Sequence, residues 1–199
     1  MLSIVLFSNS YKKNKLFSKF SGPSLGTSLE VFKLGTPIGF GIFVELSMYS
    51  GAAIILAPLG ENIVSGHAVA LNIASIVFML PLAIGLAAST RIGNLLGEKR
   101  YIEARYSSMV SVSLCFIGAL FNMTLLITLG DKLISLYTTD LLVYSIASNL
   151  IIFAAIFQIP DGIGMGSLGA LRGYKDTFMT MVFIIVAYWV FAIPFGYYL

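Results

Sequence analysis

The chain has 199 residues, of which 58% are hydrophobic and 11% charged, and its mean hydropathy is +0.93. Soluble domains carry about a quarter charged residues, so this composition excludes an ordinary soluble domain and predicts a protein of the lipid bilayer. The net charge of +3 is too small to indicate a nucleic-acid partner. A single cysteine, Cys115, excludes an internal disulfide framework.

Five stretches are long and apolar enough to cross a membrane, which takes about 20 mostly apolar residues. In chain order they cover residues 37–58, 67–90, 107–129, 141–171 and 177–199. Short polar connectors separate them, and the alternation of apolar and polar residues typical of strands is absent from the sequence. We therefore expect an all-α integral membrane protein with about five transmembrane helices.

Residues 1–36 precede the first span and are predicted to form a cytoplasmic N-terminal segment. The opening apolar run of about six residues is too short for a signal peptide, and its lysines follow the run instead of preceding it. This run is more typical of the end of a membrane helix. Since the fifth span also ends without a polar anchor, we expect the chain to be a piece of something larger.

The basic residues are distributed very unevenly over the two ends of the predicted spans. Eleven of the twelve lie in the N-terminal segment and in the second and fourth connectors, which share one side, whereas Lys132 stands alone on the other. Lysine and arginine accumulate on the cytoplasmic side of a membrane. The N-terminus is therefore predicted to be cytoplasmic.

Two acidic residues, Glu45 and Asp161, fall inside apolar segments. An acid at the centre of a bilayer costs about 2.5–3.5 kcal/mol on insertion, so such residues usually mark an ion or substrate pathway. At about 1.5 Å per residue, Glu45 lies roughly 12 Å and Asp161 roughly 16 Å from the cytoplasmic ends of their spans. Two carboxylates at similar depth predict a site for a monovalent cation or a shared proton.

A second interpretation of Asp161 stays open at this point. The stretch "IPDGI" suits a turn, because proline, aspartate and glycine all favour turn positions. The glycines that follow also spell GxGxxG, but a dinucleotide site needs a strand before the glycines and a βαβ unit around them, and neither is predicted. The spacings of Gly162 to Gly166 and of Gly169 to Gly173 favour close helix contacts instead.

Other residues inside the spans are weaker candidates. Met48, Tyr49, Phe153 and Phe157 could line an adaptable apolar pocket for organic cations. Asn72 is expected to bond across helices, or alternatively to line the cation path. No HExxH, GxSxG, CxxC or P-loop motif occurs in the sequence, so no enzyme and no cofactor is predicted.

Four segments together resemble a known transporter family. They are "KLGTPIGFGIFVELSMYS", "HAVALNIASIVFMLPLAIGLAASTRIGNLLGEK", "FAAIFQIPDGIGMGSLGALRGYKDT" and "YWVFAIPFGYYL". They resemble successive parts of the multidrug and toxic compound extrusion (MATE) family, and most of all its NorM-like branch. The resemblance extends from about residue 32 to residue 199.

The resemblance implies a fold of twelve helices in two lobes that exchanges sodium ions or protons for organic cations. The chain would supply helices 7–11, most of the C-terminal lobe, with residues 37–199 as its transmembrane bundle and residues 1–36 as a remnant of the inter-lobe linker. Glu45 and Asp161 would belong to the cation site, organic cation drugs would be the substrates, and the missing N-terminal lobe would be the partner. The expected location is the bacterial inner membrane.

Two other functions stay open. A lipid or polysaccharide-precursor flippase of the related superfamily would share the architecture, but its cavity should carry basic residues to hold phosphates, and no lysine or arginine lies within a predicted span. The chain could also be an inactive fragment of a split gene, because alternating access needs one half of a transporter to move against the other.

Overall fold

The computed structural model describes residues 24–192, and the side chains of residues 24–190. The chain divides into two compact parts, residues 1–33 and 34–199. In the first part, residues 25–33 are helical. Most of the predicted N-terminal segment, residues 1–23, and the end of the predicted fifth span, residues 193–199, lie outside the described residues.

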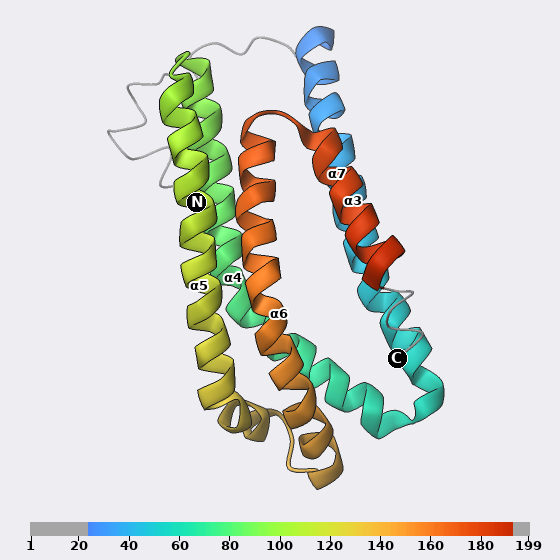
Figure 1. Ribbon diagram of the computed structural model, residues 1–199. Coiled ribbons are helices and arrows are strands. Elements are labelled where there is room, and N and C mark those ends of the chain that lie inside the picture. Colours follow the sequence, from blue (N-terminus) through green and yellow to red (C-terminus); the bar gives the residue numbers. More distant parts are fainter. Residues whose placement is uncertain (1–23, 193–199) are drawn as a thin grey trace, which may run out of the picture. The chain divides into compact units, whose positions relative to one another are not determined.

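The described residues form helices and no strand (Figure 1). Their order is α3 (Leu25–Leu56), the 3-10 turn η1 (Ala57–Leu59), α4 (Glu61–Gly97), α5 (Tyr101–Tyr137), α6 (Leu141–Gly173), α7 (Thr177–Ile185) and the π-helix η2 (Val186–Ala192). The four helices α3 to α6 are long and apolar enough to cross a membrane, and the stretch Thr177–Val190 is a shorter apolar helix. The prediction of an all-α membrane protein is confirmed.

The helices extend beyond the predicted spans, and the connectors are correspondingly short. The first helix begins at Leu25 rather than at Pro37, which lies inside it. Most of the predicted connector between the second and third spans is helical, with only residues 98–100 between α4 and α5. Hydropathy marks only the part of a helix that lies in hydrocarbon, whereas backbone hydrogen bonding continues into the polar flanks.

Acidic caps fix where the last two α-helices begin. The Asp140 carboxylate accepts hydrogen bonds from the backbone N–H of Leu142 at 2.8 Å and of Val143 at 3.3 Å. The Asp176 carboxylate accepts one from the N–H of Met179 at 3.1 Å. Each cap satisfies donors that the first helical turn leaves unpaired, so α6 and α7 start at defined residues.

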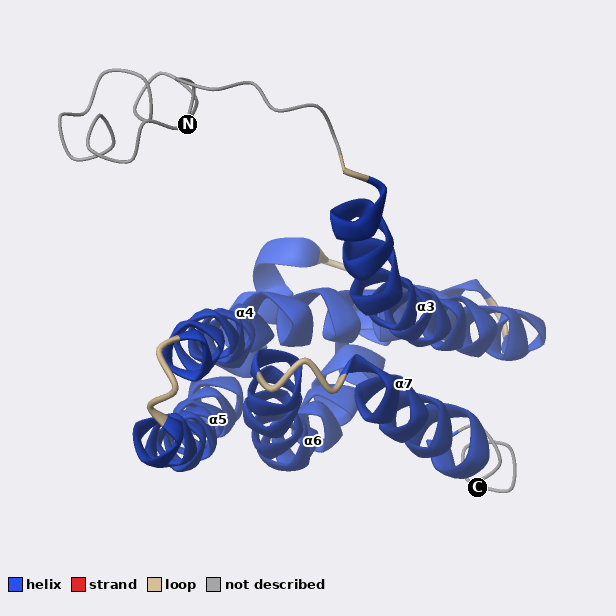
Figure 2. Cartoon of the chain, turned by 90° about the horizontal axis from the view of Figure 1, so that it is seen from above, coloured by secondary structure: helices blue, strands red, loops and turns tan. Residues whose placement is uncertain are grey.

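Glycines bring α6 into backbone contact with both α4 and α5, and the three helices lie together (Figure 2). A Cβ added at Gly166 would lie 2.9 Å from Val112 Cα on α5. One added at Gly169 would strike the Gly85 carbonyl on α4. Small residues permit such approaches where packing, and not water exclusion, drives helix association. The contact role predicted for the spaced glycines is therefore confirmed.

A buried amide pair links the same three helices. Pro81 has no N–H, so the carbonyl of Val77 loses its donor within α4. The Asn122 side chain on α5 donates to that carbonyl at 2.7 Å and to Gln158 Oε1 on α6 at 3.4 Å. Both amides are almost fully buried, at 2% and 3% exposure. The pair thus satisfies a carbonyl freed by proline and joins α4, α5 and α6.

We predict that Gly166→Ala destabilises the bundle while Gly164→Ala does not. At Gly166 the new methyl meets α5 backbone, and overpacking of this kind costs about 1–3 kcal/mol. At Gly164 no atom lies within 4 Å of the added Cβ, and alanine is the better helix former by about 1 kcal/mol. Thermal unfolding in one detergent measures both variants, and equal melting temperatures would contradict the contact.

We further predict that Asn122→Leu lowers stability by about 1–2 kcal/mol, because it leaves the Val77 carbonyl buried without a donor. The matched control is Thr124→Val on the same helix, whose exposed hydroxyl donates only to Leu120 O of its own helix. This control should change stability by less than about 0.5 kcal/mol. Denaturation of both variants in mixed micelles measures their stability. If Asn122→Leu were as stable as the unmodified chain, the hydrogen bond from Asn122 to the Val77 carbonyl would not stabilise the bundle.

Candidate functional site

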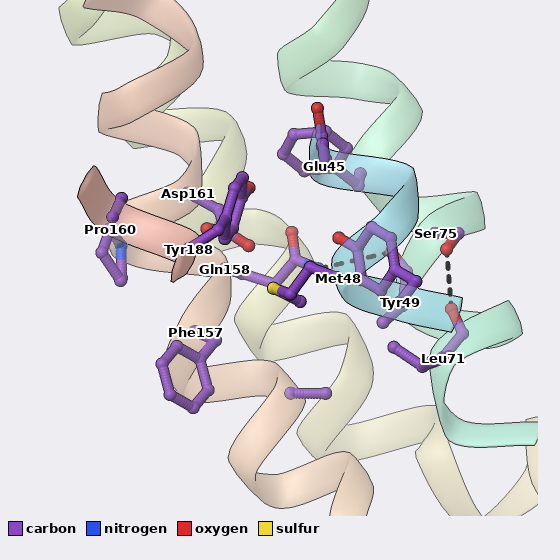
Figure 3. A pocket seen from close by; sticks show the side chains of 14 residues that line it. Glu45, Met48, Tyr49, Leu71, Ser75, Phe157, Gln158, Pro160, Asp161 and Tyr188 are labelled. Atoms are coloured by element: carbon purple, nitrogen blue, oxygen red, sulfur yellow. Dashed lines mark hydrogen bonds between the residues drawn. The ribbon is translucent and has the colours of Figure 1, made fainter. Parts of the chain in front are cut away.

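A cavity of about 450 Å³ opens between four elements of the second part of the chain. It is lined by side chains of α3, α4, α6 and η2, and Figure 3 shows them converging from facing helices. Helices α4 and α6, which the glycine contacts and the amide pair hold together, supply one wall of the cavity. Helix α3 and η2 supply the other wall. The cavity is therefore bounded partly by the tight block of α4, α5 and α6 and partly by helices outside that block.

Glu45 of α3 and Asp161 of α6 both line this cavity (Figure 3). Helix α6 continues through Pro160 and Asp161 to Gly173, so the interpretation of "IPDGI" as a turn is wrong. Within residues 24–192 neither carboxylate has a hydrogen-bond or ion-pair partner. The fold thus brings two acids from distant segments to one space and leaves their oxygens available.

Neutral oxygen groups accompany the two acids. Ser75 of α4 lines the cavity and donates its hydroxyl to Leu71 O at 2.8 Å, which leaves lone pairs on the oxygen. Gln158 also lines it, three residues before Asp161 on the same face of α6. Its Nε2 donates to Ala74 O at 3.4 Å, so the amide is oriented from the α4 side.

The remaining wall is apolar and aromatic. Of the four candidates for an apolar pocket, Met48, Tyr49 and Phe157 lie on the cavity lining, whereas Phe153 does not. Tyr188 lies there too (Figure 3), and sequence reasoning missed it. It belongs to the π-helix η2, whose wider turn changes which residues share a face.

Asn72 lies elsewhere. It is not among the residues that line the cavity, and its Oδ1 accepts a hydrogen bond from the Tyr137 hydroxyl of α5 at 2.8 Å. Its position on the span next to that of Glu45 suggested a path residue, but its side chain joins α4 to α5. The structure therefore gives Asn72 the expected cross-helix contact and not the alternative place on the cavity lining.

The chemistry of the lining favours cations over anions. Two carboxylates and the Ser75 hydroxyl supply oxygen ligands, and none of the described lining residues is basic. Hard monovalent cations prefer such oxygens, while aromatic faces attract larger organic cations. Within the described residues no group of three or more His, Cys, Asp or Glu could hold a metal ion, so a resident metal centre is not indicated there.

Comparisons with known proteins show the family of the chain. The MatE family model matches residues 37–198. "Multidrug resistance protein NorM" of Vibrio vulnificus is 39% identical over 99% of the chain, and "Multidrug resistance protein PmpM" of Pseudomonas aeruginosa is 36% identical over 94%. "Probable multidrug resistance protein NorM" of Bacillus cereus is 37% identical over 92%.

The chain spans only about two fifths of the length of these curated relatives: 43%, 39% and 40% of each. It therefore corresponds to part of each relative. The family match nevertheless covers more than four fifths of the chain, including α4, α5 and α6 and both cavity acids. The chain belongs to the MatE family, as its sequence motifs indicated.

Proposed function

We propose that the chain is the C-terminal-lobe portion of a cation-coupled multidrug antiporter that exports organic cations. One observation carries this proposal: Glu45 and Asp161, from helices far apart in the sequence, share one aromatic-walled cavity that no described basic residue lines. Intramembrane acids are expensive and mark ion pathways. The names of the relatives, which are multidrug resistance proteins, support the same conclusion.

In this mechanism a sodium ion or a proton binds at Glu45 and Asp161 and biases the lobe between inward-facing and outward-facing states. A ligand shifts such an equilibrium only if it binds the two states with different affinity. Here the difference arises because Glu45 and Asp161 stand on different walls of the cavity. The organic cation, held against Met48, Tyr49 and Phe157, leaves as the coupling ion enters.

The N-terminal lobe is the proposed partner, since alternating access in such folds requires one repeat to move against another. We place the protein in the bacterial inner membrane with a cytoplasmic N-terminus. The end of α4, the turn that follows and the start of α5 together hold Arg91, Lys99, Arg100 and Arg105. This cluster supports the orientation through the excess of basic residues on the cytoplasmic side.

A flippase is less well supported. A cavity for phosphate-bearing lipid precursors needs cationic or other strong donor groups, of which arginine is the usual one. The described lining of this cavity instead contains two acids and no basic residue. Anionic substrates would be repelled there.

We predict that Asp161→Asn lowers the affinity of the chain for its coupling ion at least tenfold, which corresponds to about 1.4 kcal/mol. The amide keeps the shape of the carboxylate but removes one of the two negative charges. Radioactive sodium binding to the chain in lipid nanodiscs measures the effect at pH 8. A parallel titration from pH 8 to pH 5 without sodium tests for protons.

The matched control is Glu61→Gln, which removes an exposed carboxylate at the start of α4, away from the cavity. Its binding should equal that of the unmodified chain. If Asp161→Asn binds both ions as tightly as the control does, the assignment of Asp161 to the cation site is wrong.

We also predict that sodium ions or protons compete with tetraphenylphosphonium for the chain. The coupling ion and tetraphenylphosphonium would bind the same two carboxylates in one cavity. Binding of either ligand should therefore raise the apparent dissociation constant of the other. Replacing Phe157 with alanine should weaken tetraphenylphosphonium binding severalfold and leave sodium binding unchanged, because only the organic cation needs the aromatic wall. Independent binding of the two cations would argue against antiport through this cavity.

A further inference from the structure

A second cavity, of about 570 Å³, lies where α4 ends and α5 begins. It shares no lining residue with the cavity that contains the two acids of the proposed cation site. Its lining includes charged side chains of both signs, from Arg91, Glu98, Arg100 and Glu103. The proposed transport mechanism uses none of these side chains as a ligand, so their convergence on one cavity calls for a separate explanation.

This cavity lies at the boundary of the membrane. Arg91 is the first charged residue after the apolar stretch 67–90, and its Nε donates a hydrogen bond to Ser107 Oγ at 3.0 Å. Ser107 is the first residue of the next apolar stretch, 107–129. The bond therefore joins α4 and α5 where both helices leave the hydrocarbon region, which is the depth of the lipid headgroups.

Arg91 can receive an anion in the cavity that it lines. Among the described residues it forms no ion pair, since the ion pairs there are those of Arg100 with Glu98 and Glu103. The bond to Ser107 uses Nε and leaves both terminal amino groups of the guanidinium available in the described part of the chain. Guanidinium donors match the oxygens of a phosphate group, often two at a time.

The other charges of the lining can receive a cation. Arg100 donates two hydrogen bonds to Glu103, at 2.7 and 2.5 Å, and one to Glu98 Oε2 at 2.9 Å. One positive and two negative charges leave this group with a net charge of −1. Glu98 Oε1 accepts no hydrogen bond from the described residues, so this oxygen is open to a donor from a ligand.

The two receptors stand in a fixed order along α4. Glu98 follows Arg91 by seven residues, so the two lie two turns apart on one face. At 1.5 Å per residue their separation along the helix is about 10 Å. Arg91 is on the membrane side and Glu98 is beyond the end of the helix. A bound ligand should therefore have its negative group nearer the membrane than its positive group.

Apolar side chains continue the cavity toward the membrane interior. Leu86 lies one turn before Thr90 of the lining on α4, and Val110 lies two turns after Glu103 of the lining on α5. Both are exposed. A ligand that matches the whole surface has an apolar body, then a phosphate, then an ammonium group.

We propose that this cavity binds the headgroup of phosphatidylethanolamine, with the phosphate on Arg91 and the ammonium on Glu98. The inference goes beyond the proposed transport function and does not depend on it. An anionic headgroup would satisfy Arg91 but would meet the net negative charge of the group around Arg100. A choline headgroup has the right charges but no N–H to donate to Glu98, whereas a primary ammonium has three.

The lipid preference of the full chain tests the proposal. Native mass spectrometry of the chain in detergent measures its binding of phosphatidylethanolamine, phosphatidylcholine and phosphatidylglycerol with identical acyl chains. The affinity for phosphatidylethanolamine should exceed that for each of the other two lipids at least fivefold. Equal affinities for the three lipids would overturn the proposal.

Three variants test the residues. Arg91→Gln should weaken phosphatidylethanolamine binding at least fivefold, because the phosphate loses its partner. Glu98→Gln should bring the affinities for phosphatidylethanolamine and phosphatidylcholine within twofold of each other, because only the primary ammonium needs that carboxylate. The matched control is Lys99→Gln, which removes an exposed positive charge of the same turn outside the lining and should have less than a twofold effect. If the control loses as much binding as Arg91→Gln, general attraction to basic residues explains the binding and the site is wrong.

A second measurement needs no variant and covers the case in which Arg91→Gln does not fold. Phosphatidylethanolamine with a photoreactive diazirine near the start of one acyl chain is crosslinked to the chain in phosphatidylcholine nanodiscs. Mass spectrometry of the peptides should place the crosslinks between residues 86 and 110. Unlabelled phosphatidylethanolamine should suppress them. Crosslinks spread evenly over the apolar helices would refute a specific site.

Soluble competitors distinguish a headgroup site from a site for any phosphate. Glycerophosphoethanolamine should suppress the crosslinks at concentrations at which inorganic phosphate, at equal ionic strength, does not. If inorganic phosphate suppresses them equally well, the cavity binds a free anion and the assignment to an ethanolamine lipid is wrong.

Discussion

The close approach of α6 to α4 and α5 is the constraint on which the rest of the structure depends. Gly166 admits the α5 backbone and Gly169 admits that of α4. In hydrocarbon, lipid tails are as apolar as leucine, so helices associate through contacts of this kind and not through water exclusion. With α6 fixed on two sides, the direction in which Asp161 projects is fixed as well.

The cavity follows from this arrangement. Helices α4 and α6 form a wall that cannot easily shift, because the Asn122–Gln158 pair ties them to α5 at the point where Pro81 frees a carbonyl. Helix α3 and η2 complete the enclosure and bring Glu45 and Tyr188. One acid therefore stands on the tied block and the other outside it. If one cation contacted both acids, its affinity would depend on the distance between the two walls.

The charged residues of the described chain stand in two different settings. At the turn between α4 and α5, Arg100 binds Glu98 at 2.9 Å and Glu103 at 2.5 Å in an exposed cluster that contributes little to stability. In the apolar segments, Glu45 and Asp161 have no ion-pair partner among the described residues. Unpaired charge in an apolar segment costs free energy, so these two carboxylates are unlike the exposed ion pairs of the turn.

The sequence by itself determined that the protein is a helical membrane protein, that two acids lie inside its apolar segments and that its spaced glycines make helix contacts. Hydropathy, charge and spacing are local properties and can be found in one segment at a time. It did not determine where helices end, since hydrogen bonding continues past the apolar window, as at Leu25 and Gly97. Only the tertiary structure decided that Tyr188 lines the cavity and that Asn72 does not. Those outcomes depend on which helices enclose the cavity and on a hydrogen bond to another helix, and the periodicity of one segment does not specify its neighbours.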